Sequence, residues 1–177
     1  MHPCILREAP YDKCTMSSEK GKELSIILHN IRSAHNVGAI FRTADAVGVS
    51  HIYCTGYTPT PVDRFGQIRK DIAKTALGAE RTIDWSKEKN VSVLIEKLKQ
   101  KGVYVVAVEQ DSRSVSYRNI SKHESMCIVM GNEVLGISRA VRNRCDMIAE
   151  IPMKGKKESL NVSVATGIVL YEVVAFE

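Results

Sequence analysis

Residues 151–168 read Ile-Pro-Met-Lys-Gly-Lys-Lys-Glu-Ser-Leu-Asn-Val-Ser-Val-Ala-Thr-Gly-Ile, and they are the most informative part of the chain. They join a predicted strand, residues 147–151, to a predicted apolar helix, residues 160–176. A helix start offers free backbone N–H groups and the positive end of the helix dipole, so this connection is suited to hold a carboxylate or a phosphate. The alternative is that Ser159 or Asn161 only caps the helix and that the lysines of the connection are solvated.

Short apolar runs alternate with segments of helical periodicity along the rest of the chain. The predicted strands cover residues 24–29, 51–55, 81–84, 103–108, 126–130 and 147–151. The predicted helices cover residues 37–47, 64–77, 91–101, 138–144 and 160–176. Asn36 is the expected N-cap of the first helix, and Gly48 is its expected stop. This alternation predicts an α/β fold with a mostly parallel sheet flanked by helices.

Two loops follow late strands of this predicted sheet. Gly131, Asn132 and Glu133 follow the strand over residues 126–130, and the connection over residues 152–161 follows the last strand. Ligands of parallel sheets bind beyond the carboxyl ends of the strands, so we expect both loops to form one site. A glycine at position 131 lets the backbone approach a ligand closely, although a simple tight turn is the commoner explanation for a lone glycine.

Composition narrows the class of protein. We divide the 177 residues into a short N-terminal extension, residues 1–22, and a single domain, residues 23–177. No run approaches the roughly 20 apolar residues that span a bilayer. The five cysteines are odd in number and form no Cys-x-x-Cys pair, which argues against a zinc site or a disulfide framework and for a reducing, cytoplasmic location. Cys54 and Cys127 lie in apolar runs and are expected to be buried thiols.

The net charge of +5 favours an anionic partner. The basic residues form three clusters, over residues 64–74, 139–144 and 154–157. Each cluster taken alone is also compatible with a solvated helix face. We expect these clusters to contact phosphates, and aromatic residues are too few for base stacking to be expected.

The helix predicted over residues 160–176 is apolar on nearly every face. Such a helix needs burial on all sides, whereas a C-terminal helix of a small domain usually keeps one outward face. We therefore expect a second subunit to cover that face in a homodimer. The alternative is a helix buried entirely within one chain.

Two further segments identify a family resemblance. Residues 30–44 read Asn-Ile-Arg-Ser-Ala-His-Asn-Val-Gly-Ala-Ile-Phe-Arg-Thr-Ala, and residues 129–138 read Val-Met-Gly-Asn-Glu-Val-Leu-Gly-Ile-Ser. Together with residues 151–168, and in this order, they resemble the three motifs of the SpoU (TrmH) family. Its members are S-adenosylmethionine-dependent RNA ribose 2′-O-methyltransferases of the SPOUT class. The resemblance implies a deep trefoil knot in the C-terminal half, a homodimer, and tRNA or rRNA as substrate.

The resemblance also assigns roles to residues of this chain. The positions that it implies for the cofactor pocket are Gly131, Ile151, Met153 and Leu160. The positions that it implies for catalysis are Asn36, Arg42, Glu133, Ser159 and Asn161. Val134 stands where the family often has glycine, which alters the loop. Glu133 is expected either to complement the sulfonium charge or to anchor the first motif and the dimer.

Arg42 follows two apolar residues and is expected to enter an apolar neighbourhood, where a charge needs a partner or a task. A guanidinium is a poor proton acceptor because its pKa lies above about 12. We interpret Arg42 as a clamp for a substrate phosphate that also stabilises the developing alkoxide. The resemblance further implies that Arg42 serves the cofactor site of the neighbouring subunit.

Two other functions remain open at this stage. One is a knotted RNA-binding protein without catalysis, which the complete set of motif residues disfavours. The other is an α/β enzyme for a small phosphorylated metabolite, which the lysine-rich loop allows but the first motif does not support. His35 and His123 are possible bases by residue type only.

Overall fold

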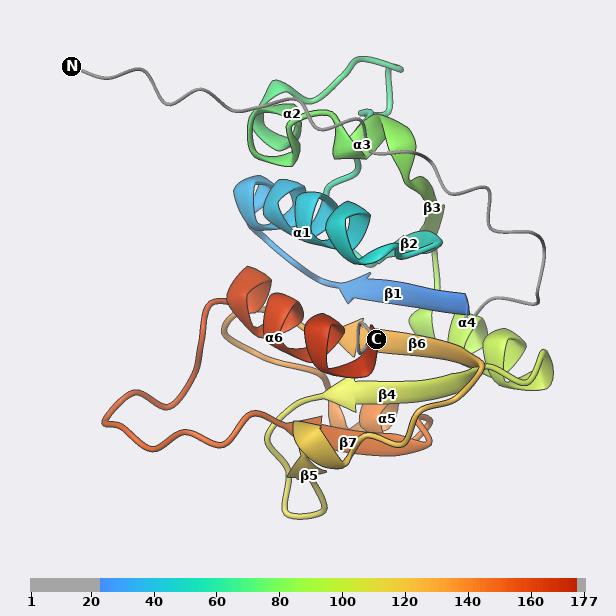
Figure 1. The fold of residues 1–177 in the computed structure, drawn as a ribbon. Helices are drawn as coiled ribbons and strands as arrows, with labels where there is room; N and C mark the ends of the chain where they lie inside the picture. Colours follow the sequence, from blue (N-terminus) through green and yellow to red (C-terminus); the bar gives the residue numbers. More distant parts are fainter. Residues whose placement is uncertain (1–22, 175–177) are drawn as a thin grey trace, which may run out of the picture.

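The structure, a computed structural model, describes residues 23–174 and consists of a parallel sheet between two layers of helices (Figure 1). Its strands are β1 (Glu23–His29), β2 (His51–Thr55), β3 (Asp84–Glu88), β4 (Tyr104–Val108), β5 (Val115–Ser116), β6 (Ser125–Met130) and β7 (Met147–Glu150). Its helices are α1 (Ala34–Val47), α2 (Lys70–Ala76), α3 (Ala79–Thr82), α4 (Val91–Gln100), the 3-10 turn η1 (Tyr117–Asn119), α5 (Arg139–Arg142) and α6 (Val162–Val174). The strand order is β3-β2-β1-β6-β4-β7-β5, and every neighbouring pair is parallel, so the predicted α/β class is confirmed.

Alternate residues of the central strands face two separate cores. Ile26 and Leu28 of β1 join a cluster with α1, α2, α3 and α6 on one face of the sheet. Ile27, between them, joins a cluster with α4 and α5 on the other face. Because β1, β4 and β6 are covered on both faces, they read as continuous apolar runs. Cys54 and Cys127 are buried in these clusters, and burial raises the pKa of both thiols to about 12.

Helix α1 begins one turn earlier than predicted. Ser33 is its N-cap, and the Ser33 Oγ accepts a hydrogen bond from the backbone N–H of Asn36 at 3.2 Å. The prediction of Asn36 as the cap is therefore wrong, because Ser33 satisfies the free N–H groups and leaves the Asn36 side chain available for other contacts. Gly48 ends the helix with φ of 76°, as expected for a left-handed C-cap.

The region between β2 and β3 differs most from the prediction. Residues 64–69, expected to be helical, form a turn because the Asp63 Oδ1 accepts hydrogen bonds from the backbone N–H groups of Phe65 and Gln67. Residues 79–82, partly predicted as a strand, form helix α3, and the strand itself is β3. β3 escaped detection because it is an edge strand with little burial and no apolar alternation.

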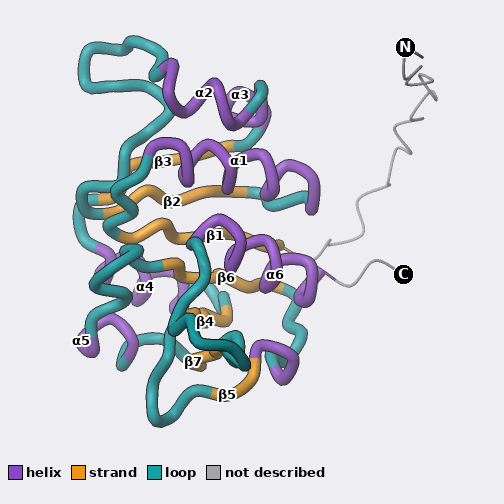
Figure 2. The backbone as a smooth tube through the Cα atoms, turned by 90° about the vertical axis from the view of Figure 1, so that its left-hand side faces the viewer, coloured by secondary structure: helices purple, strands orange, loops and turns teal. Residues whose placement is uncertain are grey.

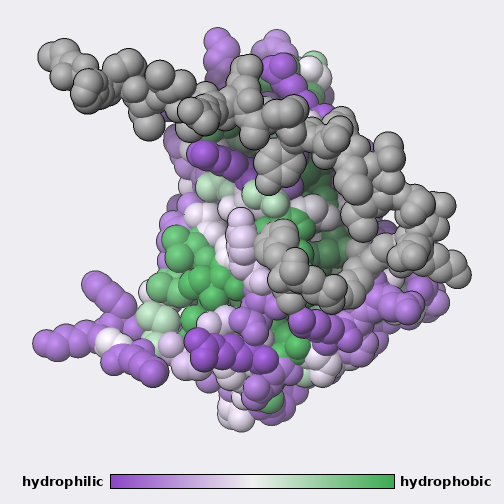
Figure 3. All heavy atoms as spheres, viewed as in Figure 1, coloured by the Kyte–Doolittle hydropathy of each residue, from purple (hydrophilic) through white to green (hydrophobic). Residues whose placement is uncertain are grey.

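Helix α6 is buried on one side only within the chain. Val162, Val169, Leu170 and Val173 pack into the core, while Val164 keeps 51% of its surface exposed. Figure 3 shows apolar residues gathered over α6 on the face toward the viewer. The expectation of burial on all sides is thus not met within one chain. None of the helices in residues 23–174 has the length and apolar character needed to cross a membrane.

Candidate active site

A cleft of about 320 Å³ opens at the carboxyl ends of β4, β6 and β7. Its walls come from residues 108–110, 130–136, 150–153 and 158–165. In Figure 2 the loop that leads into α6 crosses the front of the molecule at this edge of the sheet. The structure places six of the predicted site residues in these walls: Gly131, Glu133, Ile151, Met153, Ser159 and Leu160.

Gly131 is required by the packing of its own loop. A Cβ atom at this position would lie 2.5 Å from Ile137 Cγ1 and 2.7 Å from the carbonyl carbon of Gly136. The loop therefore folds back onto Gly131 more tightly than any side chain allows. The tight-turn reading of this glycine is supported, and the turn also brings the Gly131 backbone into the cleft wall.

Asn132 organises the same loop from within. Its Oδ1 accepts hydrogen bonds from the backbone N–H groups of Val134 at 2.9 Å and Leu135 at 2.7 Å. Its Nδ2 donates to the backbone oxygen of Asn30 and to the Tyr57 hydroxyl, both at 2.9 Å. One buried amide thus fixes the second motif to the end of β1 and to the loop after β2.

Glu133 anchors the start of α1. Its carboxylate accepts hydrogen bonds from the backbone N–H groups of Arg32 and Ser33 and from the Nδ2 of Asn36, at 3.1, 3.3 and 3.0 Å. Partial burial by itself raises the pKa of Glu133, but the hydrogen bonds from Arg32, Asn36 and Ser33 outweigh burial and hold the pKa below its usual value. Of the two expected roles, the geometry therefore favours the anchoring of the first motif.

Asn36 and Asn161 extend this contact to the third motif. The Asn161 Nδ2 donates to the Asn36 Oδ1 at 3.1 Å, and the Asn161 Oδ1 accepts from the backbone N–H of Ser163 at 2.8 Å. Asn161 thus caps α6, which agrees with the alternative, drawn from the sequence, that Ser159 or Asn161 caps this helix. Glu133, Asn36 and Asn161 form one continuous chain of hydrogen bonds at the mouth of the cleft, where the three motifs meet.

Arg42 does not line this cleft. It is exposed on α1, points to a different side from the buried Phe41, and borders a separate recess with Lys74, Leu77 and Tyr171. Arg42 is therefore exposed and not buried with Phe41, because successive helical residues are about 100° apart and point to different sides. Apolar residues of its expected neighbourhood, such as Ala46, nevertheless line the same recess. Asn36 does not line the cleft itself but is hydrogen-bonded to Glu133 of its wall, whereas Arg42 lies further along the same helix.

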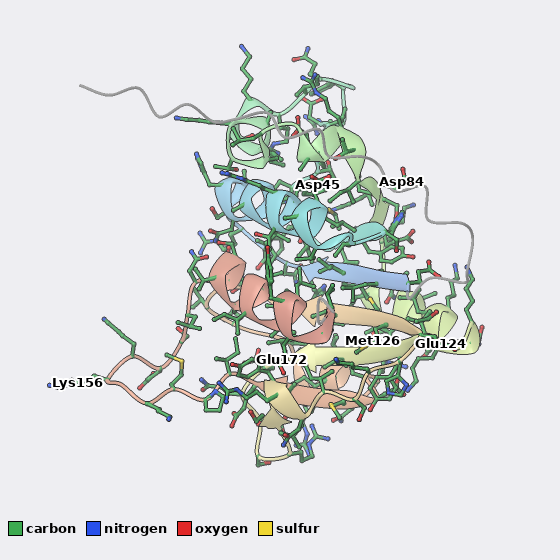
Figure 4. The ribbon with its side chains drawn as sticks, viewed as in Figure 1. Asp45, Asp84, Glu124, Met126, Lys156 and Glu172 are labelled. Carbon is green, nitrogen blue, oxygen red and sulfur yellow. The ribbon has the colours of Figure 1, made fainter. Side chains whose placement is uncertain are left out.

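The lysine-rich part of the loop stands outside the cleft. Lys154, Lys156 and Lys157 are all exposed, and Figure 4 shows Lys156 pointing away from the body of the molecule. The base of the loop is held by Gln110, whose Nε2 donates to the backbone oxygen of Glu158 at 2.7 Å. These lysines are therefore placed to meet a ligand larger than the cleft.

Neither histidine considered as a base lies at the cleft. His35 is exposed on α1, and His123 stacks on Tyr104 at a centroid distance of 3.8 Å. Tyr104 is the first residue of β4, so His123 lies at the opposite end of the strands from the cleft. Within the described residues, no three His, Cys, Asp or Glu side chains gather as metal ligands would.

Sequence reasoning did not single out Glu109 and Gln110, two polar residues of the cleft. The Glu109 Oε2 accepts a hydrogen bond from the backbone N–H of Ile137 at 2.7 Å. This bond fixes the end of the second motif to the loop after β4. A usable signal existed, because Glu109 and Gln110 directly follow a buried strand and ligands of parallel sheets bind at that edge.

The cleft offers two kinds of surface to a ligand. Its apolar side chains include Val108, Met130, Ile151 and Leu160. Its carboxylates are those of Glu109, Glu133, Glu150 and Glu158. Apolar walls suit a purine ring, and carboxylates suit ribose hydroxyls and a cationic sulfonium, so these residues fit S-adenosylmethionine.

Comparison with known proteins gives a consistent result. The model of the SpoU rRNA Methylase family matches residues 23–171. A 23S rRNA (guanosine-2′-O-)-methyltransferase, RlmB of Ralstonia nicotianae, is 36% identical over 155 residues, which cover 88% of this chain and 59% of that protein. The chain spans 57% to 66% of the length of several curated relatives that it matches.

Solved structures agree in fold. The AdoMet-bound rRNA methyltransferase from Sinorhizobium meliloti is 30% identical with a TM-score of 0.74, and the match covers 86% of this chain and 56% of that one. The TrmH/SpoU tRNA modifying enzyme of A. aeolicus is 33% identical with a TM-score of 0.76, over 88% of this chain and 76% of that one.

Proposed function

The chain belongs to the SpoU rRNA methylase family, and we therefore propose that it transfers a methyl group from S-adenosylmethionine to a ribose 2′-oxygen of tRNA or rRNA. One observation carries the proposal. The three sequence motifs meet through Glu133, Asn36 and Asn161 at the mouth of a single cleft. A small-metabolite enzyme would not need basic residues beyond the cleft, such as Lys156.

The residues that would hold the cofactor are Gly131, Ile151, Met153 and Leu160. When bound, S-adenosylmethionine supplies an electrophilic methyl group. The chain contributes a fixed geometry: the Gly131 turn sets the wall, and Ser159 and Asn161 lie where α6 begins. Fixing the positions of two reactants is itself a large source of rate acceleration.

Arg42 and Asn36 have different tasks in this proposal. Arg42 binds a substrate phosphate and stabilises the negative charge that develops on the ribose oxygen. Asn36 holds the start of α1 against Glu133 and Asn161 and so orients the helix that carries Arg42. Ser159 is exposed in the cleft wall and is available to orient the ribose.

A homodimer would bring Arg42 to a cleft. The outward faces of α1 and α6 form a shallow surface with Ala39, Val164, Gly167 and Ile168, next to the recess of Arg42. Apolar side chains exposed side by side favour contact with another copy of the chain. We place Arg42 of one chain at the cleft of its partner. We also propose that the C-terminal half of the chain forms a deep trefoil knot and that the protein is cytoplasmic.

Transfer of labelled methyl groups tests this function. Protein incubated with labelled S-adenosylmethionine and bulk tRNA or rRNA should yield labelled 2′-O-methylnucleosides after enzymatic digestion. Label on a base, or RNA binding without any transfer, would contradict the proposal, and the second result would favour a non-catalytic RNA-binding protein.

A further inference from the structure

The loop between β2 and α2 is an ordered structure that holds two side chains out into solvent. We call residues 61–69 the Phe65 loop. Val62 and Ile68 pair as an antiparallel bridge, and the backbone N–H of Arg69 donates to the oxygen of Pro61 at 2.9 Å. At the tip, the Asp63 Oδ1 accepts from the backbone N–H groups of Phe65 and Gln67 at 2.8 and 2.9 Å.

The tip of the Phe65 loop presents an aromatic ring and a guanidinium together. Phe65 keeps 72% of its surface exposed, and the Arg64 guanidinium carbon lies 4.7 Å from the centre of its ring. A guanidinium over one face of a ring leaves the other face open. A loop that only connected β2 to α2 would bury such a ring, and the fixed geometry lowers the entropy lost on binding.

The Phe65 loop stands at the same edge of the sheet as the cleft. Its approach is tied to the ends of β1 and β2, because the Thr58 Oγ1 donates to the backbone oxygen of Leu28 at 2.8 Å and the Lys87 Nζ donates to the backbone oxygens of Gly56 and Thr58. Figure 2 shows this loop projecting at one end of the molecule, while the loop before α6 crosses its front. Both loops therefore stand at the edge of the sheet where the strands end, and the cleft lies along that edge from the Phe65 loop.

The charge around the Phe65 loop is positive. Arg64, Lys70 and Lys74 lie in or just after it, and Arg69 pairs with Asp71 at 3.1 Å. Positive charge attracts a nucleic acid and repels a basic peptide. A flat ring beside this charge adds a surface on which any base can stack.

We propose that the Phe65 loop binds an unpaired nucleotide of the RNA substrate that lies outside the target nucleotide. Phe65 stacks on its base, and Arg64 binds the adjacent phosphate. This proposal rests on the proposed function, because it assumes an RNA substrate at the cleft. It differs from the expectation, drawn from the small number of aromatic residues, that base stacking plays no part.

Binding of a single-stranded oligoadenylate of about 12 nucleotides, within the usual range of site sizes, tests the proposal. Phe65→Ala should weaken binding about 5- to 150-fold, the factor for about 1–3 kcal/mol per stacked base, while Phe65→Tyr retains affinity. Ile68→Ala is the matched control, because Ile68 is 54% exposed in the same loop but has no ring. Arg64→Gln should reduce the slope of log affinity against log salt by about 0.7.

Fluorescence gives a direct readout of stacking. Phe65→Trp adds a second tryptophan to a chain whose sole tryptophan is Trp85, and RNA should quench the added signal while the parent protein sets the baseline. Unchanged affinity in Phe65→Ala, or no added quenching in Phe65→Trp, overturns the proposal. A shift in oligomeric state with unchanged RNA affinity also overturns it and identifies a protein contact. These measurements need no methyl transfer, so failure of the catalytic assignment would be seen separately.

Discussion

The cleft edge of the sheet and the outer face of α1 and α6 differ in how far one chain completes them. At the cleft, the side chains of Glu133, Asn36 and Asn161 are linked by hydrogen bonds within one chain. On the outer face, Val164 is half exposed and Arg42 is exposed at the border of a recess. One chain therefore builds a place for the cofactor but leaves its proposed catalytic arginine outside it. The difference supports the proposal that two chains together form the functional unit.

The largest expected effect is that of removing Arg42, which should lower the rate of methyl transfer without changing cofactor binding at the cleft. Arg42→Ala should lower the rate of methyl transfer about 10²- to 10³-fold, the usual effect of removing one group that stabilises transition-state charge. Cofactor affinity, measured by calorimetry, should stay unchanged, because Arg42 does not line the cleft of its own chain and is proposed to contact a substrate phosphate, not the cofactor, at the partner's cleft. A loss of cofactor affinity equal to the loss of rate would break the distinction.

The outer face should control assembly. Val164→Asp should weaken a dimer about a hundredfold or more, because a buried, unpaired charge costs about 3–5 kcal/mol and appears twice in a two-fold interface. Val93→Asp is the matched control, because Val93 is 44% exposed on α4, which covers the other face of the sheet. Analytical ultracentrifugation over a range of concentrations separates the two. Equal self-association of both variants would contradict the assignment of the interface.

The cleft should respond to a single methyl group. Gly131→Ala should lower the free energy of unfolding by about 1–3 kcal/mol, the usual cost of overpacking, and should weaken cofactor binding. Gly155→Ala is the control, since a Cβ at Gly155 meets no atom within 4 Å. Urea denaturation and calorimetry measure both effects. If the two variants behave alike, the close contact between Gly131 and residues 136–137 does not govern the cleft.

The smallest effect concerns the pH dependence of Glu133. Its pKa is lowered in the folded protein, so its contribution to stability is fully present above the ordinary glutamate pKa of about 4 and is lost as the pH falls below that value. Glu133→Gln should be less stable than the parent at pH 7 by about 1 kcal/mol, with partial solvent exposure limiting the effect. The gap between the two proteins should narrow in acid. A gap that widened as the pH fell would show the opposite sign of coupling.

The sequence predicted the parts of the fold that rest on continuous apolar runs. Strands β1, β2, β4 and β6 came out close to their observed bounds because burial on both faces leaves a simple pattern. The bounds of the edge strand β3 were not predicted, because an exposed strand has no continuous apolar run. The prediction of a helix over residues 64–69 is wrong, because sequence periodicity does not weigh the side-chain turn of Asp63 against helical backbone hydrogen bonds.

The cleft walls were also predictable, because both loops follow buried strands. The orientation of Arg42 was not, because neighbouring apolar residues do not show which side of a helix is buried. The link from Glu133 through Asn36 to Asn161 joins residues about 100 positions apart or more and leaves no local trace. The division into residues 1–22 and 23–177 stays a prediction, since residues 1–22 and 175–177 lie outside the described part of the chain.

Mixing two inactive proteins tests most directly whether Arg42 completes the partner's cleft. One protein carries Arg42→Ala, and the other carries Leu160→Trp, which fills the cleft from an exposed position in its wall. Each must first be shown to be folded and inactive, and the pair must be shown to exchange subunits. In a two-fold dimer, each heterodimer then combines one intact cleft with one intact Arg42 from the other chain.

We predict that such heterodimers recover up to about half of the wild-type rate of methyl transfer, since one of two sites is restored. If Arg42 instead acted within its own chain, every site in the heterodimer would lack either the arginine or the cleft. No recovery after confirmed exchange would contradict the account.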